Sequence, residues 1–490
     1  MKTQDHALLP AVILAELEAA VGRDGLLVER SQLQTYECDG LTAIRTLPSA
    51  VVLPRSTAQV QAVVQTCARH KIAFVARGAG TGLSGGALPA EGGIVISFAR
   101  MTEILNVDLV NQRMTVQPGV INNHLTARVA PHGYFYAPDP SSQSVCTIGG
   151  NVAENAGGAH CLKYGFTTTH VLGLEVVLPT GEKVHLGAPT LDAPGYDLLG
   201  VFVGSEGTLG VATEITLRIV KKPETVQVLL AAFDSIACAG QTVSDIIAAA
   251  ILPAAMEIMD RLSIQSAEAA VHPNYPVCEA LLLIELDGPA AEVALQMDQV
   301  RQLCRDNGAW EDRLAHTERE RMLVWKGRKA AFAAAGRLAP NYIVQDGVIP
   351  RTRLPEVLDR IAQMSQEVGL QVTNVFHAGD GNLHPIVLYD ASIPGQEQIA
   401  VNLSLGILRV CVDLGGSITG EHGVGREKQE SMGYMYAEPD LSTMHRVRHA
   451  FDPENISNPD KLFPRPRLCG EKTGPYTPHP LETAGIAEYF

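Results

Sequence analysis

Hydrophobic and polar positions along the chain follow two different patterns, with a change near residue 222. From about residue 50 to residue 220, short runs of β-branched residues alternate with glycine and proline, which is typical of strands joined by turns. One helical period covers 60–71, and two apolar runs at 174–178 and 183–186 flank Pro-Thr-Gly-Glu as the strands of a hairpin would. The pattern in the first half of the chain therefore predicts a glycine-rich α+β domain.

The second half alternates longer strand and helix patterns. Strands are expected at 226–233 and 280–287 and helices at 235–252 and 290–307, and a similar order recurs from residue 342 through a helix at 355–368. This order predicts two split βαβ units that share one antiparallel sheet. The predicted organisation is a first domain at 1–222, a second at 223–450, a return segment at 451–463 and a proline-rich tail at 464–490 that is extended or disordered.

Composition narrows the class of protein. The chain has 490 residues and a formal net charge of −15, a sign that repels nucleic-acid backbones and anionic lipid heads. Its nine cysteines contain no CxxC pair, which argues against iron–sulfur clusters and zinc ribbons and fits a reducing compartment. The longest apolar stretch, 246–259, contains Pro253 and Glu257 and is shorter than the roughly 18 residues that a membrane span needs. We therefore expect a cytoplasmic protein that is at most peripheral to a membrane.

A glycine-rich loop at 77–86 is the first candidate for chemistry. It follows a predicted strand and would let several backbone N–H groups approach a phosphate closely. Gly80, Gly82 and Gly85 satisfy GxGxxG, but a nicotinamide-binding loop would open a helix, and here Pro89 and a strand at 94–98 follow. The loop therefore predicts a phosphate site of another kind, with a long glycine-shaped turn as the alternative.

Two further glycine-rich segments, 137–165 and 204–210, supply small residues of the kind found where backbone lies against a flat ring. In this order, with Pro54-Arg55-Ser56 and Gln117-Pro118-Gly119-Val120, the segments resemble the flavin domain of the FAD-linked oxidases of the vanillyl-alcohol oxidase type over residues 50–220. The resemblance implies a FAD-binding domain of two subdomains, with the subdomain of the pyrophosphate loop starting at about residue 50.

The same resemblance implies how FAD is held. Some members attach the flavin through a histidine in the first loop, but no residue of 77–88 is His or Cys, so we expect non-covalent FAD. The residues implied to bind it are Arg77, Gly78, Ala79, Gly80, Thr81, Gly82, Leu83, Ser84, Pro138, Asp139, Ser142, Thr147, Gly149, Asn151, Val211 and Asn458.

A histidine-containing stretch at 375–385 is the most informative part of the sequence. Asp380-Gly381 between apolar runs is typical of a two-residue hairpin turn, which would pair His377 directly with His384. Opposed side chains have Cβ atoms about 4.5–5.5 Å apart, so both imidazoles could reach one metal ion. Two surface histidines on a hairpin are the alternative.

A second turn, 415–425, places a carboxylate beside an imidazole at Glu421-His422. Two histidines and a glutamate form a ligand set typical of an open catalytic zinc site. The spacing alone does not show that the two segments meet.

The histidine stretch and Glu421-His422-Gly423, together with Asp452-Pro453 and Asn458-Pro459-Asp460-Lys461, resemble the C-terminal domain of the D-2-hydroxy-acid dehydrogenases of this superfamily. Within that group the similarity is greatest to glycolate oxidase flavin subunits and covers nearly the whole chain. The resemblance implies a substrate or cap domain with a large antiparallel sheet and ferredoxin-like βαβ units. It also implies a divalent metal, zinc or else manganese, on His377, His384 and Glu421, with His422 as the catalytic base.

The segment Trp325-Lys326-Gly327-Arg328-Lys329 resembles the family segment whose arginine clamps the substrate carboxylate, and a guanidinium suits that bidentate task. Arg328 is therefore the expected anchor, with a solvated charge on a basic helix as the alternative. Where relatives that oxidise a dicarboxylate carry further polar groups, this chain has Phe332 and Val344. A second carboxylate would be buried without a partner, which favours a short monocarboxylate such as glycolate or D-lactate.

The expected activity is FAD-dependent oxidation of such an acid to the 2-oxo acid. The chain carries no cluster or haem motif, so the resemblance implies companion subunits, one flavin-type and one iron–sulfur, that pass electrons to quinone at the cytoplasmic membrane face. A dehydrogenase that acts alone and a non-catalytic FAD-fold scaffold subunit remain alternatives. Redox-neutral chemistry of the alkyl-glycerone-phosphate synthase kind is disfavoured because the histidine cluster on which it depends has no counterpart in this chain.

Overall fold

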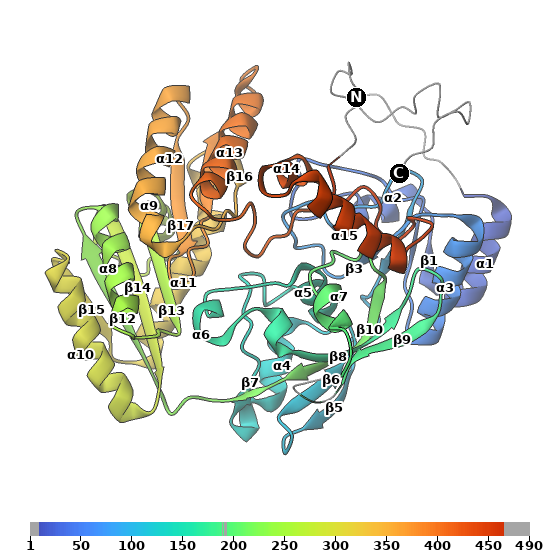
Figure 1. Ribbon diagram of the computed structural model, residues 1–490, viewed down its shortest axis with the longest axis horizontal. Helices are drawn as coiled ribbons and strands as arrows, with labels where there is room; N and C mark the ends of the chain where they lie inside the picture. The colour runs from blue at the N-terminus through green and yellow to red at the C-terminus, as the bar shows by residue number, and fades with distance from the viewer. Residues whose placement is uncertain (1–8, 189, 191–193, 465–490) are drawn as a thin grey trace.

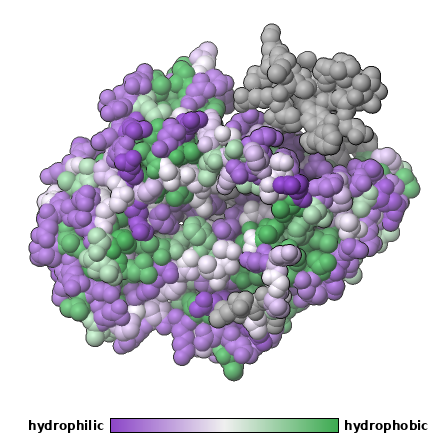
Figure 2. Space-filling view, in the orientation of Figure 1, coloured by the Kyte–Doolittle hydropathy of each residue, from purple (hydrophilic) through white to green (hydrophobic). Residues whose placement is uncertain are grey.

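The computed structural model describes residues 9–188, 190 and 194–464, so the tail predicted at 464–490 lies outside the described residues except for Pro464. Figure 1 shows two lobes, one that holds β1 to β11 and one built around β12 to β18, with the last helix, α15, lying over the first lobe. No helix among the described residues is long and apolar enough to cross a membrane. On the face shown in Figure 2, hydrophilic and hydrophobic residues are interspersed.

The first subdomain is a four-stranded sheet of order β1-β2-β4-β3, in which the last three strands are parallel. Helix α3 connects β2 to β3, and its N-cap Ser56 accepts a hydrogen bond from the backbone N–H of Gln59. The glycine loop follows β3, at the carboxyl end of the parallel strands, where open α/β sheets bind ligands. The elements are α1 Ala11–Val21, β1 Leu26–Leu27, α2 Arg30–Leu33, β2 Ala50–Val52, α3 Thr57–His70, β3 Phe74–Arg77 and β4 Ile94–Ser97.

The second subdomain is a five-stranded antiparallel sheet of order β5-β6-β10-β8-β9, with a separate pair β7-β11. The predicted hairpin is confirmed as β8 and β9, and α4 and α5 pack on the sheet through Leu125, Val129 and Ile148. The elements are β5 Ile104–Asp108, β6 Arg113–Val116, α4 Asn122–Val129, β7 Tyr134–Phe135, α5 Ile148–Glu154, α6 Cys161–Tyr164, β8 Val171–Val177, β9 Lys183–Gly187, α7 Leu198–Phe202, β10 Val211–Arg218 and β11 Val220–Lys221.

The second lobe, here called the cap, contains a seven-stranded antiparallel sheet of order β15-β12-β14-β13-β17-β18-β16. Leu229 and Ala231 of β12 face one core with α8, α10, α12 and α13, whereas Val228 and Leu230 face the other core with α9 and α11. The elements are β12 Thr225–Phe233, α8 Ile236–Ala248, β13 Ala255–Asp260, α9 Arg261–Val271, β14 Ala280–Gly288, α10 Ala290–Asp306, β15 Glu311–Ala315, α11 Glu318–Ala334, β16 Asn341–Val344, α12 Leu354–Val368, β17 Val372–His377, β18 Pro385–Tyr389, α13 Gln396–Asp413 and α14 Met432–Met435. The chain then continues as α15, Glu438–Phe451, over the first lobe.

The cap confirms the predicted α+β class, with a large antiparallel sheet, but two of its strands, β13 and β15, were not predicted. The sequence was expected to be helical over 235–252, whereas α8 ends at Ala248 and an unpredicted strand, β13, begins at Ala255. Pro253 separates the two elements, and the strand is buried on both faces, so its sequence shows no polar alternation. With β13 included, β12, β13, β14 and β15 have the spatial order 4-1-3-2 of a ferredoxin-like unit.

The segment after α15 packs on the first subdomain. Phe74 N–H donates to Ile456 O at 2.8 Å, and Asn458 N–H donates to Phe74 O at 2.7 Å. Ile456 is buried in the core of the parallel sheet. The C-terminal segment therefore lies beside β3, the strand that precedes the glycine loop.

Candidate active site

The histidine hairpin has a different register from the predicted one. His377 N–H donates to Asn382 O at 3.1 Å, and Asn374 pairs with Pro385, so the connection is four residues long, not two. The predicted direct pairing of His377 with His384 is therefore wrong by two residues. Because side chains alternate with a period of two, a shift of two keeps both imidazoles on one face, and their ring centroids lie 5.0 Å apart.

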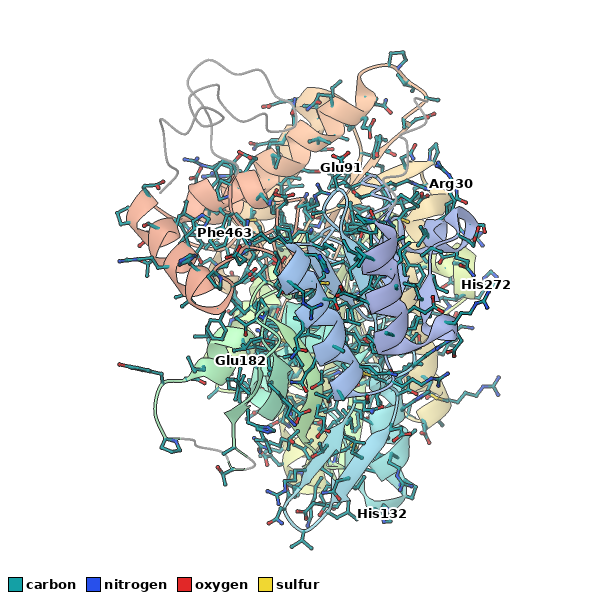
Figure 3. The ribbon with its side chains drawn as sticks, turned by 90° about the vertical axis from the view of Figure 1, so that its right-hand side faces the viewer. Arg30, Glu91, His132, Glu182, His272 and Phe463 are labelled. Atoms are coloured by element: carbon teal, nitrogen blue, oxygen red, sulfur yellow. The ribbon has the colours of Figure 1, made fainter. Side chains whose placement is uncertain are left out.

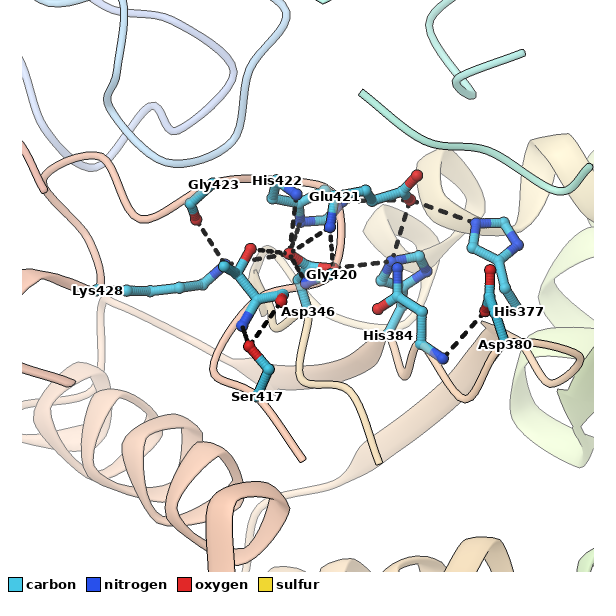
Figure 4. Close-up of polar contacts among 12 residues, drawn as sticks. Asp346, His377, Asp380, His384, Ser417, Gly420, Glu421, His422, Gly423 and Lys428 are labelled. Carbon is cyan, nitrogen blue, oxygen red and sulfur yellow. Dashed lines mark hydrogen bonds and ion pairs between the residues drawn. The ribbon is translucent and has the colours of Figure 1, made fainter. Parts of the chain in front are cut away.

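Glu421 joins the two histidines. Its Oε1 lies 3.3 Å from His377 Nε2 and 3.3 Å from His384 Nε2, as Figure 4 shows. One ligand atom from each of the three residues lies within 4.8 Å of the others. Both ring nitrogens of His384 are buried: Nε2 has only the Glu421 and Asp346 carboxylates as neighbours, and Nδ1 has no hydrogen-bond partner within the described ranges. Such imidazole nitrogens next to a carboxylate are donors that suit a divalent cation such as zinc, so these residues could hold one.

A buried carboxylate that the sequence reasoning missed orients His377. Glu257, on the unpredicted strand β13, accepts from His377 Nδ1 at 2.7 Å. The contact directs Nε2 toward Glu421, as carboxylates that bond a metal-ligating histidine commonly do. The signal that could have found it is a carboxylate within an apolar run, since such a group is rarely buried without a partner.

Arg328, on α11, contacts Glu257, the carboxylate that orients His377. Its Nε and Nη2 lie 2.6 and 2.5 Å from Glu257 Oε2, and the side chains of both residues are at most 3% exposed. One turn further on, the Phe332 ring meets the His384 ring edge to face at a centroid distance of 5.4 Å. Lys329 and Phe332 line the cavity described below, and Arg328 is not among its lining residues. In the structure Arg328 therefore forms an ion pair with Glu257 and does not line the cavity.

Asp346 is a second carboxylate that the sequence reasoning missed. It follows β16 and accepts from Thr419 Oγ1 at 2.5 Å and from the backbone N–H groups of Gly420, Glu421 and His422 at 3.1, 3.2 and 2.8 Å. Burial alone would raise the pKa of this carboxyl, but the neighbouring His422, Lys428 and His384 hold that pKa well below its ordinary value. The turn that carries Glu421 and His422 is therefore built around a fixed negative charge.

His422 stands at the boundary between this cluster and the first lobe. Its ring is stacked on that of His384, with centroids 5.0 Å apart and planes at 3°. Burial lowers the pKa of His422 to about 4, and His384 and Lys428 add to the effect against the opposing charge of Asp346. The ring is neutral at pH 7 and able to accept a proton.

The next residues of the turn are held by contacts from the first lobe. Glu206 accepts the N–H groups of Val424 and Gly425 at 2.7 Å each, and its own backbone has a φ of 53°. Asn458 Nδ2 donates to Glu206 O at 2.6 Å and to Gly86 O at 2.9 Å. These contacts fix the His422 turn against the glycine loop.

A cavity of about 430 Å³ lies at this junction. Glu421 and His422 line one side of it, and the glycine loop lines another. The predicted cofactor residues that line it are Arg77, Gly78, Ala79, Gly80, Thr81, Gly82, Leu83, Ser142, Thr147, Gly149, Asn151 and Val211.

Four predicted cofactor residues do not line the cavity. The Ser84 carbonyl accepts the N–H groups of Arg426 and Glu427, and Pro138 O accepts from Asn122 Nδ2. Asp139 Oδ2 lies 2.9 Å from His160 Nδ1, and Asn458 binds Glu206 as described above. These residues support the walls of the cavity from behind.

The lining fits a dinucleotide. A Cβ at Gly78 would overlap Thr147 Oγ1, and a Cβ at Gly80, which has a φ of 69°, would overlap the Arg77 guanidinium, so a larger residue at either position would have to displace its neighbour. Thr147 Oγ1 is buried without a hydrogen bond to any described residue. A close-packed backbone with unpartnered donors suits a pyrophosphate.

Fold and site together define a two-domain flavoprotein, with a nucleotide cavity in one domain and a histidine–carboxylate cluster in the other. Residues 48–187 match the FAD binding domain family, and residues 222–462 match the FAD linked oxidases, C-terminal domain. The chain belongs to the FAD-linked oxidase family, and the cofactor of its first domain is FAD.

Individual relatives agree with this membership. The chain is 50% identical over 462 residues to glycolate oxidase subunit GlcD of Escherichia coli strain K12, which covers 94% of this chain and 92% of that protein. It is 34% identical to a D-lactate dehydrogenase of Anaerostipes hadrus, covering 85% of this chain and 89% of the relative. The structure of 4-ethylphenol oxidase from Gulosibacter chungangensis superposes with a TM-score of 0.75 at 17% identity, covering 93% and 97% of the two chains, and shows the shared fold.

Proposed function

We propose that this chain oxidises a small D-2-hydroxy acid, glycolate in first place and D-lactate in second, to the corresponding 2-oxo acid. The observation that carries the proposal is that His422 lines the FAD cavity while stacked on His384 of the histidine–carboxylate cluster. The names of the relatives, glycolate oxidase subunit and D-lactate dehydrogenase, support the substrate class.

The hydride and the proton of the substrate go to different acceptors. Bound FAD supplies the acceptor for the hydride that leaves Cα of the substrate. His422 Nε2, which lies 3.9 Å from the Glu421 oxygen shared by both histidines, takes the hydroxyl proton. Two electrons leave with the hydride and one proton goes to the imidazole, so the alcohol carbon becomes a carbonyl.

The cluster of His377, His384 and Glu421 would hold a divalent ion, with zinc preferred and manganese as the alternative. Such an ion lowers the pKa of a hydroxyl that binds it. Glu257 fixes the tautomer of His377 for this task, and Asp346 fixes the backbone position of Glu421.

Two cations compete for the role of carboxylate anchor. Arg328, proposed from the sequence, already binds Glu257 through Nε and Nη2 and would use its remaining Nη1, whereas Lys329 lines the cavity. Replacing each in turn separates them: Arg328→Lys should raise KM steeply if Arg328 is the anchor, with Lys329→Gln as the matched variant. A normal KM in Arg328→Lys together with a raised KM in Lys329→Gln would transfer the role to Lys329.

The walls beside His422 favour a small substrate. Phe332 and Val344 both line the cavity, and neither offers a hydrogen-bond partner to a second carboxylate. The proposed substrate is therefore a short monocarboxylate.

Electrons must leave the reduced flavin. Because a relative is named as a subunit of glycolate oxidase, we propose a companion flavin-type subunit and an iron–sulfur subunit as the route, and through them a peripheral position at the cytoplasmic face of a membrane.

The deciding experiment is dye-coupled turnover of the FAD-loaded protein with glycolate, both lactate enantiomers, D-2-hydroxyglutarate and D-malate. We expect the highest kcat/KM with glycolate or D-lactate and at least a tenfold lower value with the dicarboxylates, about the cost of burying one unpaired polar group. Turnover of L-lactate alone, or of none of these acids, would refute the proposal.

A further inference from the structure

Glu154 is a buried acid in the FAD cavity that the proposed mechanism does not use. It is the last residue of α5 and lines the cavity together with His422. Its Oε2 is shielded from solvent and has no hydrogen-bond partner in the part of the chain that the structure describes. A Cβ placed on Gly423 would overlap this same oxygen, so the carboxyl lies directly against the turn that carries His422.

A second acid, Glu206, lies beside Glu154 and, unlike it, has a hydrogen-bond partner for each of its carboxylate oxygens. Each oxygen of Glu206 accepts a backbone N–H, from Val424 and from Gly425, at 2.7 Å. A carboxyl group whose two oxygens both accept hydrogen bonds is satisfied as the anion. Burial raises the pKa of Glu206 as well, but these two hydrogen bonds and the charges of Lys428 and Lys461 oppose the rise, so Glu206 takes the negative charge of the pair.

The positive charge of Lys428 compensates Glu154 only in part. Lys428 Nζ donates to Gly423 O at 3.3 Å and lies 3.5 Å from Asp346 Oδ2, and Asp39 adds a further negative charge. Burial, and after it the charges of Glu206 and Asp39, raise the pKa of Glu154 well above its ordinary value. Two adjacent carboxyls with unlike surroundings commonly divide in this way into one anion and one neutral acid.

We propose that Glu154 carries a proton and donates it in a hydrogen bond to an acceptor atom on the isoalloxazine ring of bound FAD. The ring offers carbonyl oxygens and ring nitrogens as acceptors, and hydrogen bonds to these atoms are a means by which a protein tunes a flavin. Placing the ring, and not the pyrophosphate, next to Glu154 rests on the proposed role of His422. Donation itself requires no turnover of any substrate.

The test compares two substitutions of nearly equal size in the full-length apoprotein, titrated with FAD and followed by flavin fluorescence. Glu154→Gln keeps a neutral hydrogen-bond donor, whereas Glu154→Met removes it. We expect Glu154→Gln to bind FAD within about threefold of the wild type and Glu154→Met to bind it about three- to tenfold more weakly, the range of one neutral hydrogen bond. Glu91→Gln, at an exposed position labelled in Figure 3, removes a glutamate outside the cavity lining and serves as the charge control.

The other outcomes overturn the proposal. If both variants bind FAD more tightly, Glu154 is an anion that repels the cofactor, and if both equal the wild type, or both weaken equally, it is not a donor to FAD. A second measurement covers the case in which a variant fails to fold. Infrared difference spectra of the wild-type protein with and without FAD should show the carbonyl stretch of a protonated carboxyl shifting on binding, and absence of that band also overturns the proposal. A failed turnover assay would leave these results intact, so the two proposals fail separately.

Discussion

The glycine loop and the histidine cluster face the same cavity, but they are built in different ways. The loop at 77–83 is continuous in the chain and presents backbone, with its shape set by positions where a Cβ would overlap Thr147 or Arg77. The cluster assembles side chains from β13, the β17–β18 hairpin and the turn after α13, up to 164 residues apart between Glu257 and Glu421. A site made of backbone tolerates changes in most side chains, whereas a site made of side chains depends on each of them and on what orients them.

The largest effect should come from the proposed base. We expect His422→Gln to lower kcat by about 10²- to 10⁴-fold, the usual contribution of a positioned acid or base, because the amide cannot take the proton. FAD binding should remain, since the loop is untouched. Steady-state kinetics measure kcat, and absorbance measures the FAD content. A kcat within threefold of the wild type would show that His422 is not the base. His124→Gln, at an exposed position on α4, is the matched control.

Next in size is the metal-binding test of the cluster. We expect His384→Ala to weaken zinc or manganese binding by more than about 100-fold, beyond the 10- to 100-fold typical for loss of a residue that only orients a ligand. Metal content after dialysis, measured by mass spectrometry, gives the answer. Unchanged content relative to the wild type would refute the three-residue metal site, whereas FAD binding should be unaffected in either case.

Arg328 offers a test of the support behind the cluster. Arg328→Ala leaves Glu257 buried without its cation, so we expect the free energy of unfolding to fall by about 3–5 kcal/mol. Arg319→Ala, at an exposed position near the start of the same helix, should change it by less than about 0.5 kcal/mol. Urea unfolding of the apoprotein compares them. Equal stability of the two variants would mean that the buried ion pair contributes little.

The smallest expected effect tests the backbone site. Gly78→Ala must displace Thr147, and we expect FAD to bind about tenfold more weakly and the apoprotein to melt at a lower temperature. Gly82→Ala is the control for the fold, because nothing lies within 4 Å of a Cβ there. Its melting temperature should match the wild type, and any loss of FAD affinity in it then reports direct approach of the cofactor. Equal melting temperatures for both variants would contradict the crowding at Gly78.

The sequence predicted the glycine loop more accurately than it predicted the histidine cluster. The loop was recognised with its residues because glycine spacing and the elements around it are local. The hairpin was recognised, yet its register was wrong by two residues, since the pairing is set by contacts of Gly379 with Met256 O and of Leu383 with Gly347 O. Both contacts join the hairpin to segments distant in the chain. Turn signals alone could not include them.

Glu257, Asp346 and Glu154 were missed for the same reason, because their contacts join segments distant in the chain. Glu257 was missed because no strand was predicted after the helix at 235–252, and Asp346 stands in an Asp-Gly pair directly after a strand, a pattern typical of an ordinary turn. Glu154 looked like one polar residue in a run of small ones. Each becomes significant only through its partners, which lie 71 or more residues away for Glu257, 38 or more for Asp346, and on the opposite domain for Glu154.

By itself the amino-acid sequence determined the two domains' element patterns, the glycine loop and the presence of two histidines on one face of a hairpin, because periodicity and turn chemistry act over a few residues. The tertiary structure alone decided that Glu421 reaches both histidines, that Arg328 binds Glu257, and that Glu206 joins the His422 turn to the FAD-binding lobe. These contacts depend on how a seven-stranded sheet and three smaller sheets pack together, and burial then fixes which carboxyls are charged. No local pattern encodes that packing.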